Sequence, residues 1–196
     1  MSPDDRRAAL IAATVPLLRE HGVGVTTRQI AEAAGVAEGT IFGVFPDKDS
    51  LVQAALLHAL DPADTLDALD TIDRSAGLRS RLSAAAALVN QRFADNALLL
   101  SVARSVALTA GAPADARERM ADARNRLLAA LTAVIEPDRA RLRREPAAVA
   151  RLLLLLSGAN TYGPFGDPAQ FTGDEMVALL LDGLLVRAND DPEVPC

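Results

Sequence analysis

The chain has few of the residues that form disulfides, stacked aromatic sites and membrane spans. It contains one cysteine, Cys196, no tryptophan and one tyrosine among 196 residues. A single cysteine excludes an internal disulfide. The leucine run 152–156 is far shorter than the roughly 20 apolar residues that a helix needs to cross a bilayer. No basic stretch followed by an apolar stretch opens the chain, so we expect a cytoplasmic protein without membrane contact.

Residues typical of catalytic centres are equally scarce. The histidines are His21 and His58, and no HExxH, GxSxG or glycine-rich phosphate-binding motif occurs. The acidic stretch from Asp61 to Asp73 is interpreted as a solvated helix face rather than a metal or acid–base site. We therefore expect no enzymatic activity and no cofactor or metal.

Hydrophobic residues make up 50% of the chain, and alanine and leucine dominate them. These two favour helices, whereas strands prefer β-branched and aromatic residues, so the sequence predicts an all-α fold. Pro16 lies inside the first predicted helix and should kink or split it. The predicted helices are 3–20, 26–35, 38–44, one from 47, 63–72, 77–110 with a break near 95–96, 114–135, 146–160 and 174–188.

The segment 26–51 has a more specific pattern. A threonine cap opens a short helix, and Gly35 supplies the positive φ that a sharp turn between helices requires. A second short helix begins at Glu38, and Asp47 caps the next one. Two short helices joined by a glycine turn form a helix-turn-helix unit, whose second helix can enter the major groove of DNA.

This pattern resembles the TetR family of transcriptional regulators, through Ala-Ala-Gly-Val at 33–36, Gly-Thr at 39–40 and Phe-Pro-Asp-Lys at 45–48. The resemblance implies a homodimer that binds double-stranded DNA at a near-palindromic operator, and a repressor that responds to a small-molecule effector. In the family pattern two residues contact phosphates: a threonine at the start of the first helix of the helix-turn-helix, here Thr26 or Thr27, and Lys48, the only lysine of the chain. The expected DNA-binding residues are Thr26, Thr27, Arg28, Glu38, Gly39, Thr40, Phe42, Gly43 and Lys48.

Two features depart from this expectation. The family usually has tyrosine or histidine just before Phe45 to donate to phosphates, whereas this chain has Phe42, Gly43 and Val44. Its net charge is −6, although affinity for DNA comes largely from lysine and arginine. The alternative is therefore a TetR-like helical ligand-binding or interaction module with weak or lost DNA binding.

The resemblance also implies a helix-turn-helix domain at 1–47 and an effector-binding and dimerisation domain at 48–196. The predicted helices 146–160 and 174–188 are the most apolar, and a helix that is apolar all round must be buried. We expect them to form a dimer interface, with a core inside one chain as the alternative. The expected interface residues are Leu152, Leu153, Leu155, Leu156, Val177, Leu180, Leu181 and Leu184.

An effector pocket is expected among the helices between residues 77 and 135. The loop that follows residue 161 is expected either to close its mouth or to reach the partner subunit. The scarcity of aromatic residues favours an apolar, aliphatic ligand over one bound by stacking. Each candidate has ordinary core or surface packing as its alternative role. The candidates are Asn90, Phe93, Leu98, Val102, Arg104, Ser105, Leu108, Met120, Arg124, Leu127, Tyr162 and Phe165.

Overall fold

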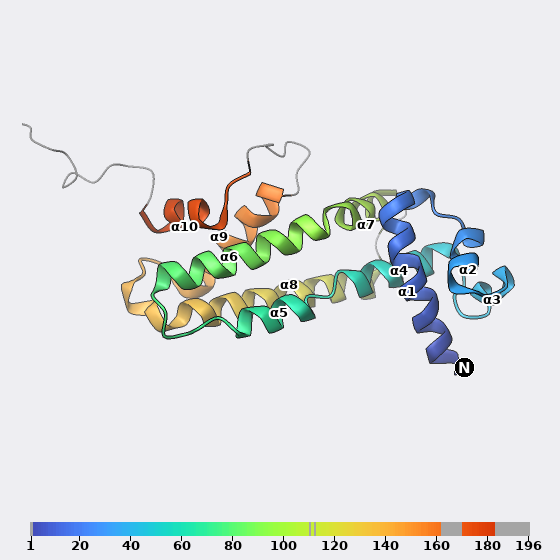
Figure 1. Cartoon of the computed structure of the whole chain (residues 1–196), viewed down its shortest axis with the longest axis horizontal. Coiled ribbons are helices and arrows are strands. Elements are labelled where there is room, and N and C mark those ends of the chain that lie inside the picture. The colour runs from blue at the N-terminus through green and yellow to red at the C-terminus, as the bar shows by residue number, and fades with distance from the viewer. Residues whose placement is uncertain (1, 110, 112, 162–169, 183–196) are drawn as a thin grey trace, which may run out of the picture. The chain divides into compact units, whose positions relative to one another are not determined.

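The computed structural model describes residues 2–109, 111, 113–161 and 170–182. These residues form helices and connecting turns and contain no strand, which confirms the predicted all-α fold (Figure 1). The elements are α1 Pro3–His21, η1 Gly22–Gly24, α2 Thr27–Ala34, α3 Glu38–Phe42, α4 Lys48–Ala59, α5 Ala63–Asp70, α6 Leu78–Asp95, α7 Ala97–Thr109, α8 Ala114–Ile135, η2 Glu136–Arg141, α9 Pro146–Thr161 and α10 Gly173–Asp182.

Most helix boundaries follow the capping and breaking residues, and α1 is not split at Pro16. It continues through Pro16 to His21 without the expected split. Pro16 and Ala12, the residue four positions earlier, are both exposed. Solvent can therefore satisfy the Ala12 carbonyl that the proline leaves without an N–H donor. The predicted end of the last helix, at residue 188, lies outside the described residues.

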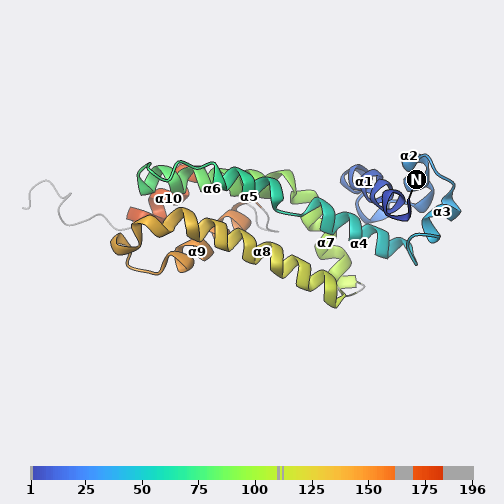
Figure 2. The same cartoon turned by 90° about the horizontal axis from the view of Figure 1, so that it is seen from below.

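The first compact unit comprises residues 1–63 and 95–127. Within it α1 packs against α2 and α4, α2 packs against α3, and α7 packs against α1, η1 and α4 (Figures 1 and 2). Leu10, Leu18 and Ile30 meet Leu51 and Leu99 in a fully buried core. The Arg7 guanidinium lies 4.3 Å from the centre of the Phe45 ring, and Phe45 is itself buried. The core therefore holds the two short helices against α1 and α4.

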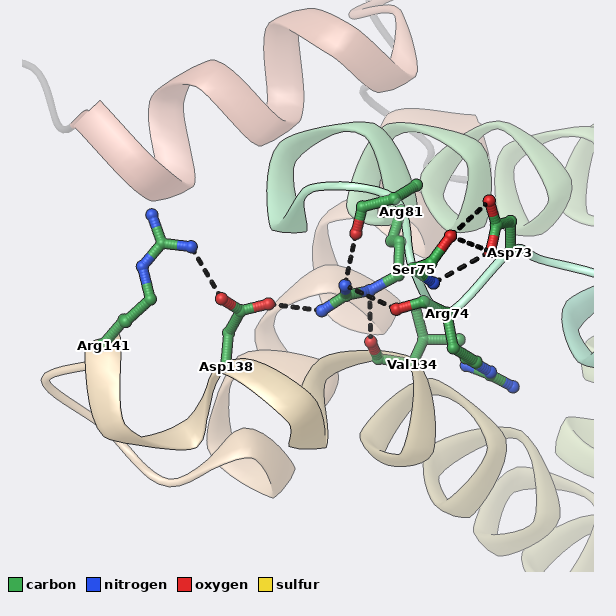
Figure 3. Close-up of polar contacts among 8 residues, drawn as sticks. Asp73, Arg74, Ser75, Arg81, Val134, Asp138 and Arg141 are labelled. Atoms are coloured by element: carbon green, nitrogen blue, oxygen red, sulfur yellow. Dashed lines mark hydrogen bonds and ion pairs between the residues drawn. The ribbon is translucent and has the colours of Figure 1, made fainter.

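The second compact unit comprises residues 64–94 and 128–196, described as far as the ranges above allow. Arg81 of α6 is a buried polar side chain of this unit with several partners, and it is 3% exposed (Figure 3). Arg81 Nε donates to the Val134 carbonyl at 3.0 Å, and Arg81 Nη1 donates to the Arg74 and Ala76 carbonyls at 3.2 and 2.5 Å. Arg81 Nη2 pairs with the Asp138 carboxylate. One buried cation thus ties the loop before α6 to the end of α8 and to η2.

Gly173 allows a close helix contact in the second unit, whereas a Cβ at Gly158 would make only an ordinary contact. A Cβ on Gly173, the first residue of α10, would lie 3.0 Å from Ala87 N and 3.1 Å from Ser83 O of α6. A Cβ on Gly158 of α9 would lie 3.4 Å from the Phe93 ring. The absence of a side chain at residue 173 therefore lets the start of α10 approach the α6 backbone.

Candidate nucleic-acid interface

The first helix of the turn-joined pair is fixed at its N-terminus by a reciprocal cap. The Gln29 N–H donates to Thr26 Oγ1 at 3.2 Å, and the Thr26 N–H donates to Gln29 Oε1 at 2.8 Å. The Thr26 hydroxyl also donates to Gln29 Oε1, at 2.8 Å. This capping box sets where α2 begins. It also uses the Thr26 hydroxyl proton within the chain, so Thr26 has no proton to donate to a DNA phosphate.

The turn between α2 and α3 depends on Gly35. Its φ of 65° and ψ of 33° place it in the left-handed region, which glycine adopts without steric cost. The Gly35 N–H donates to the Glu32 carbonyl at 3.1 Å, and the next N–H, from Val36, donates to the Ala31 carbonyl at 3.0 Å. Val36 is half-buried against the core and fills the corner, as its position in the sequence predicts.

The second helix, α3, is anchored by one side and exposed on the other. Ile41 is fully buried, whereas Glu38, Gly39 and Phe42 are exposed, with 54% of Phe42 accessible. A Cβ on Gly39 would have no neighbour within 4 Å, so the surface above it is open. This small exposed face is the part of the unit that can approach another molecule.

Helix α3 ends earlier than the sequence predicts. It was expected to continue to Val44, but its last residue is Phe42, and Gly43 occupies the C-cap position with a φ of −77°. Glycine at a helix end costs less than glycine within a helix. Gly43 therefore does not interrupt the interior of α3.

A hydrogen bond joins the two short helices at their exposed edge. The Thr27 hydroxyl donates to the Glu38 carboxylate, although eleven residues separate them in sequence. This contact holds the first side chain of α3 in place. Since the single hydroxyl proton is used, Thr27 can accept a hydrogen bond from another group but has no proton to donate to a phosphate.

Lys48 occupies an electrostatically unusual place at the first position of α4. A cation is disfavoured at a helix N-terminus, where the macrodipole favours negative charge. The Lys48 ammonium is held there by donating to the Val25 carbonyl at 3.1 Å. An ammonium has three N–H donors, so this bond leaves Lys48 able to bind an anion as well. Asp47 caps the helix by accepting from the Ser50 N–H at 2.7 Å, as predicted.

The charges around this face have both signs. Arg28 and Glu32 are exposed on α2, and Glu38 is exposed on α3. Hydrogen bonds from the Ser50 side chain and backbone lower the pKa of Asp47, which keeps that carboxylate ionised near neutral pH. The face therefore has isolated bases among acids rather than a continuous basic patch, and phosphate contacts must come from individual side chains and backbone N–H groups.

The first unit also contains a cavity of about 390 Å³ between α4, α7 and α8. Arg104 and Met120, from the expected effector residues, line it. Four further lining residues come from α4 and its C-cap, at positions 53, 56, 57 and 60. They lie outside residues 77–135, where the sequence predicted the pocket. Their spacing of three and four residues places them on one face of a helix, and this spacing is the sequence pattern that could have identified them.

The other expected effector residues lie elsewhere. Val102 and Leu127 are buried, Leu98, Leu108 and Arg124 are exposed, and Ser105 is half-buried, all without lining the cavity. Asn90 and Phe93 belong to the second unit, where the Asn90 amide lies 3.4 Å from the Met176 sulfur. Tyr162 and Phe165 lie outside the described residues.

The expected dimer residues divide into buried and exposed positions. Leu153 and Val177 are fully buried within the chain itself, and Leu180 and Leu181 are half-buried. By contrast Leu152, Leu155 and Leu156 of α9 are 47, 61 and 42% exposed. Leu184 lies outside the described residues. The exposed leucines of α9, rather than the whole helix, are available to a partner.

The fold and this site define an all-α protein of the helix-turn-helix class. Residues 10–55 match the family described as "Bacterial regulatory proteins, tetR family". This segment covers α2, α3 and their supports on α1 and α4. The helix-turn-helix segment of the chain therefore matches the tetR family, and the chain as a whole shares the fold of a TetR-family structure.

Solved structures of similar proteins share the fold along nearly the whole chain. A TetR-family regulator from Mesorhizobium loti is 17% identical, with a TM-score of 0.72 and 93% of this chain and 98% of that chain covered. A transcriptional regulator from Pseudomonas aeruginosa PAO1 is 26% identical, with a TM-score of 0.59 and coverage of 91% and 88%. FadR from Bacillus subtilis, solved in complex with stearoyl-CoA, is 15% identical, with a TM-score of 0.66 and coverage of 91% and 99%.

Among the described residues no helix is both long and apolar enough to cross a membrane. Within the same part of the chain, no group of three or more histidine, cysteine, aspartate or glutamate side chains is placed to hold a metal ion.

Proposed function

We propose that the chain is a sequence-specific DNA-binding transcriptional repressor that acts as a homodimer and responds to a small molecule. The observation that carries the proposal is the exposed face of α3. Its apolar anchor, Ile41, is buried while Gly39 and Phe42 stay open to solvent. Lys48 lies at the start of the following helix and supplies a charge for a backbone phosphate.

Dimerisation is part of the proposal because a single five-residue recognition helix reads few base pairs. Two copies related by a two-fold axis would present two recognition helices about 34–36 Å apart, one turn of DNA, which requires a near-palindromic operator. Leu152, Leu155 and Leu156 supply an exposed apolar stripe on α9 for a self-complementary contact. The division into functional domains at residue 47 belongs to the same proposal.

The effector site in this proposal is the cavity between α4, α7 and α8. Its volume falls in the range of small-molecule sites, and its walls are mainly apolar. A ligand there contacts α4, the helix that begins at Lys48. A ligand alters DNA affinity only if it binds the DNA-competent and DNA-incompetent conformations unequally.

The test is selection of bound duplexes from a random DNA pool at low salt with the full-length chain. The expected result is a near-palindromic motif that the Lys48→Ala/Thr40→Ala variant fails to enrich. Arg119→Ala, which removes an exposed base of α8, serves as the matched control and should enrich the same motif. Thermal unfolding of all three proteins checks that the variants remain folded.

The second candidate function is a ligand-binding or interaction module that no longer reads DNA. It is favoured by the absence of side-chain donors at Phe42, Gly43 and Val44 and by the net charge of −6. In that case the native chain would be folded and dimeric, yet no duplex would be enriched at any salt concentration.

A further inference from the structure

The charged residues that line the cavity of the first unit are all positively charged. Its charged lining side chains are Arg104 of α7 and Arg117 of α8, and its one other polar side chain is Gln53 of α4. No aspartate or glutamate lines it. The lining itself is almost wholly apolar and both arginines are exposed, so their guanidinium groups are available to an anionic group where the cavity opens to solvent. Guanidinium groups bind carboxylates through paired N–H donors.

These two arginines differ from the arginines that stabilise the fold. Arg79, Arg81, Arg126, Arg139 and Arg141 form ion pairs with carboxylates of the chain. Within the described residues, the side chains of Arg104 and Arg117 make no such pair, and both are exposed. Two cations without an acidic partner beside one cavity are available for an anion from outside the chain.

The rest of the wall is aliphatic. Leucines 56, 57, 60 and 100 line it together with alanines, a valine and Met120. The α4 wall runs from Gln53 to Leu60, about 10 Å along the helix axis. Such a surface favours an alkyl chain of medium length, and methionine adapts its shape to flexible apolar ligands.

We infer that the cavity binds an aliphatic monocarboxylate of about ten carbons, with the alkyl chain against α4 and the carboxylate at Arg104 and Arg117. This inference rests on the proposed function, in which the same cavity is the effector site. A cavity of about 390 Å³ fits the acid itself, whereas a coenzyme A thioester would leave its nucleotide outside the cavity and would lack the free carboxylate.

The test is isothermal titration of the full-length chain, without DNA, with decanoate and decanoyl-CoA below their micellar concentrations and decan-1-ol below its solubility limit. Decanoate is expected to bind at least tenfold more tightly than either of the other two ligands. Arg104→Gln/Arg117→Gln should abolish the preference for decanoate over decanol. Arg119→Gln, which changes an exposed base of α8 outside the cavity lining, should retain it.

A third variant tests the location of the ligand. Met120 is 38% exposed at the cavity wall, so Met120→Trp can fill the cavity without forcing a large side chain into the core. This variant should unfold as the native chain does and lose decanoate binding. Equal affinity for decanoate and decanol, tighter binding of decanoyl-CoA, unchanged binding by Met120→Trp, or no binding of decanoate would each overturn the inference.

The outcome separates the inference from the proposed function because binding is measured without DNA. Failure to enrich a duplex, with decanoate binding intact, would remove the DNA-binding proposal and leave the ligand assignment standing. Enrichment of an operator without decanoate binding would remove only the ligand assignment.

Discussion

Arg81 on α6 pairs with Asp138 of η2, and both residues belong to the second unit. The Arg81 guanidinium is almost fully buried, and the Asp138 side chain is 12% exposed. Asp138 also accepts from Arg141 Nη1 at 2.7 Å. Hydrogen bonds from Arg141 first and Arg81 second lower the pKa of Asp138 below its ordinary value of 3.8.

The first prediction concerns the dependence of this pair on pH. A lowered pKa in the folded state contributes stability that is present above about pH 4 and is lost as pH falls through the folded pKa. Asp138→Asn should therefore lower the thermal unfolding midpoint at pH 7 and have a smaller effect near pH 2. Asp64→Asn, at an exposed position of α5, serves as control. An equal loss at both pH values would show that the charge of Asp138 is not the cause.

The second prediction concerns the start of α10. Gly173→Ala would place a Cβ 3.0 and 3.1 Å from backbone atoms of α6, which cannot rotate away as a side chain can. We expect a loss of about 1–3 kcal/mol in the free energy of unfolding. Gly77→Ala, where a Cβ meets nothing within 4 Å, should change it by less than about 0.5 kcal/mol. Urea denaturation measures both, and a tolerated Gly173→Ala would mean that α10 does not lie this close to α6.

The third prediction separates the two glycines of the helix-turn-helix. Gly35→Ala puts a Cβ on a left-handed residue and should cost about 1–2 kcal/mol of stability. Gly39→Ala adds its methyl group to open space within α3 and should be neutral or stabilise by up to about 1 kcal/mol. Denaturant titration of the two variants provides the comparison, and equal losses would contradict it.

The fourth prediction concerns Glu38. Glu38→Gln keeps an oxygen acceptor for Thr27 but removes a negative charge from the face proposed to meet DNA phosphates. Affinity for a random duplex at low salt should rise roughly two- to tenfold, and the gain should shrink as salt is added. Fluorescence anisotropy with labelled DNA measures this. Unchanged affinity at low salt would place Glu38 away from the DNA.

The fifth prediction tests the α9 surface. Leu155 is 61% exposed, so Leu155→Glu should leave the chain folded while placing two like charges in a two-fold interface. Light scattering after gel filtration should show a dimer for the native chain and a monomer for this variant. Leu108→Glu, at a leucine of α7 that is 76% exposed, should remain dimeric. A dimeric Leu155→Glu would move the interface elsewhere.

The sequence predicted the features that depend on local chemistry. Gly35 required a positive φ and Asp47 capped α4, because turns and caps are determined by a few neighbouring residues. The cavity was less predictable. Its α4 residues were not among the predicted pocket residues, since an apolar helix face has the same spacing whether it meets side chains or a ligand. The engagement of Arg81 by three carbonyls also depends on segments distant in sequence.

Helix α4 has one end at the site proposed to meet DNA and the other at the cavity, and both sites belong to one compact unit. Twelve residues make a rod about 18 Å long. Because a helix of this length moves as a rigid body, a rotation of α4 by about 5° around its cavity end would displace Lys48 by roughly 1.5 Å. That displacement is comparable to half a hydrogen-bond length. Ligand occupancy would therefore change the contact of Lys48 with Val25 or with a phosphate through one short helix, without a signal passing through the second unit.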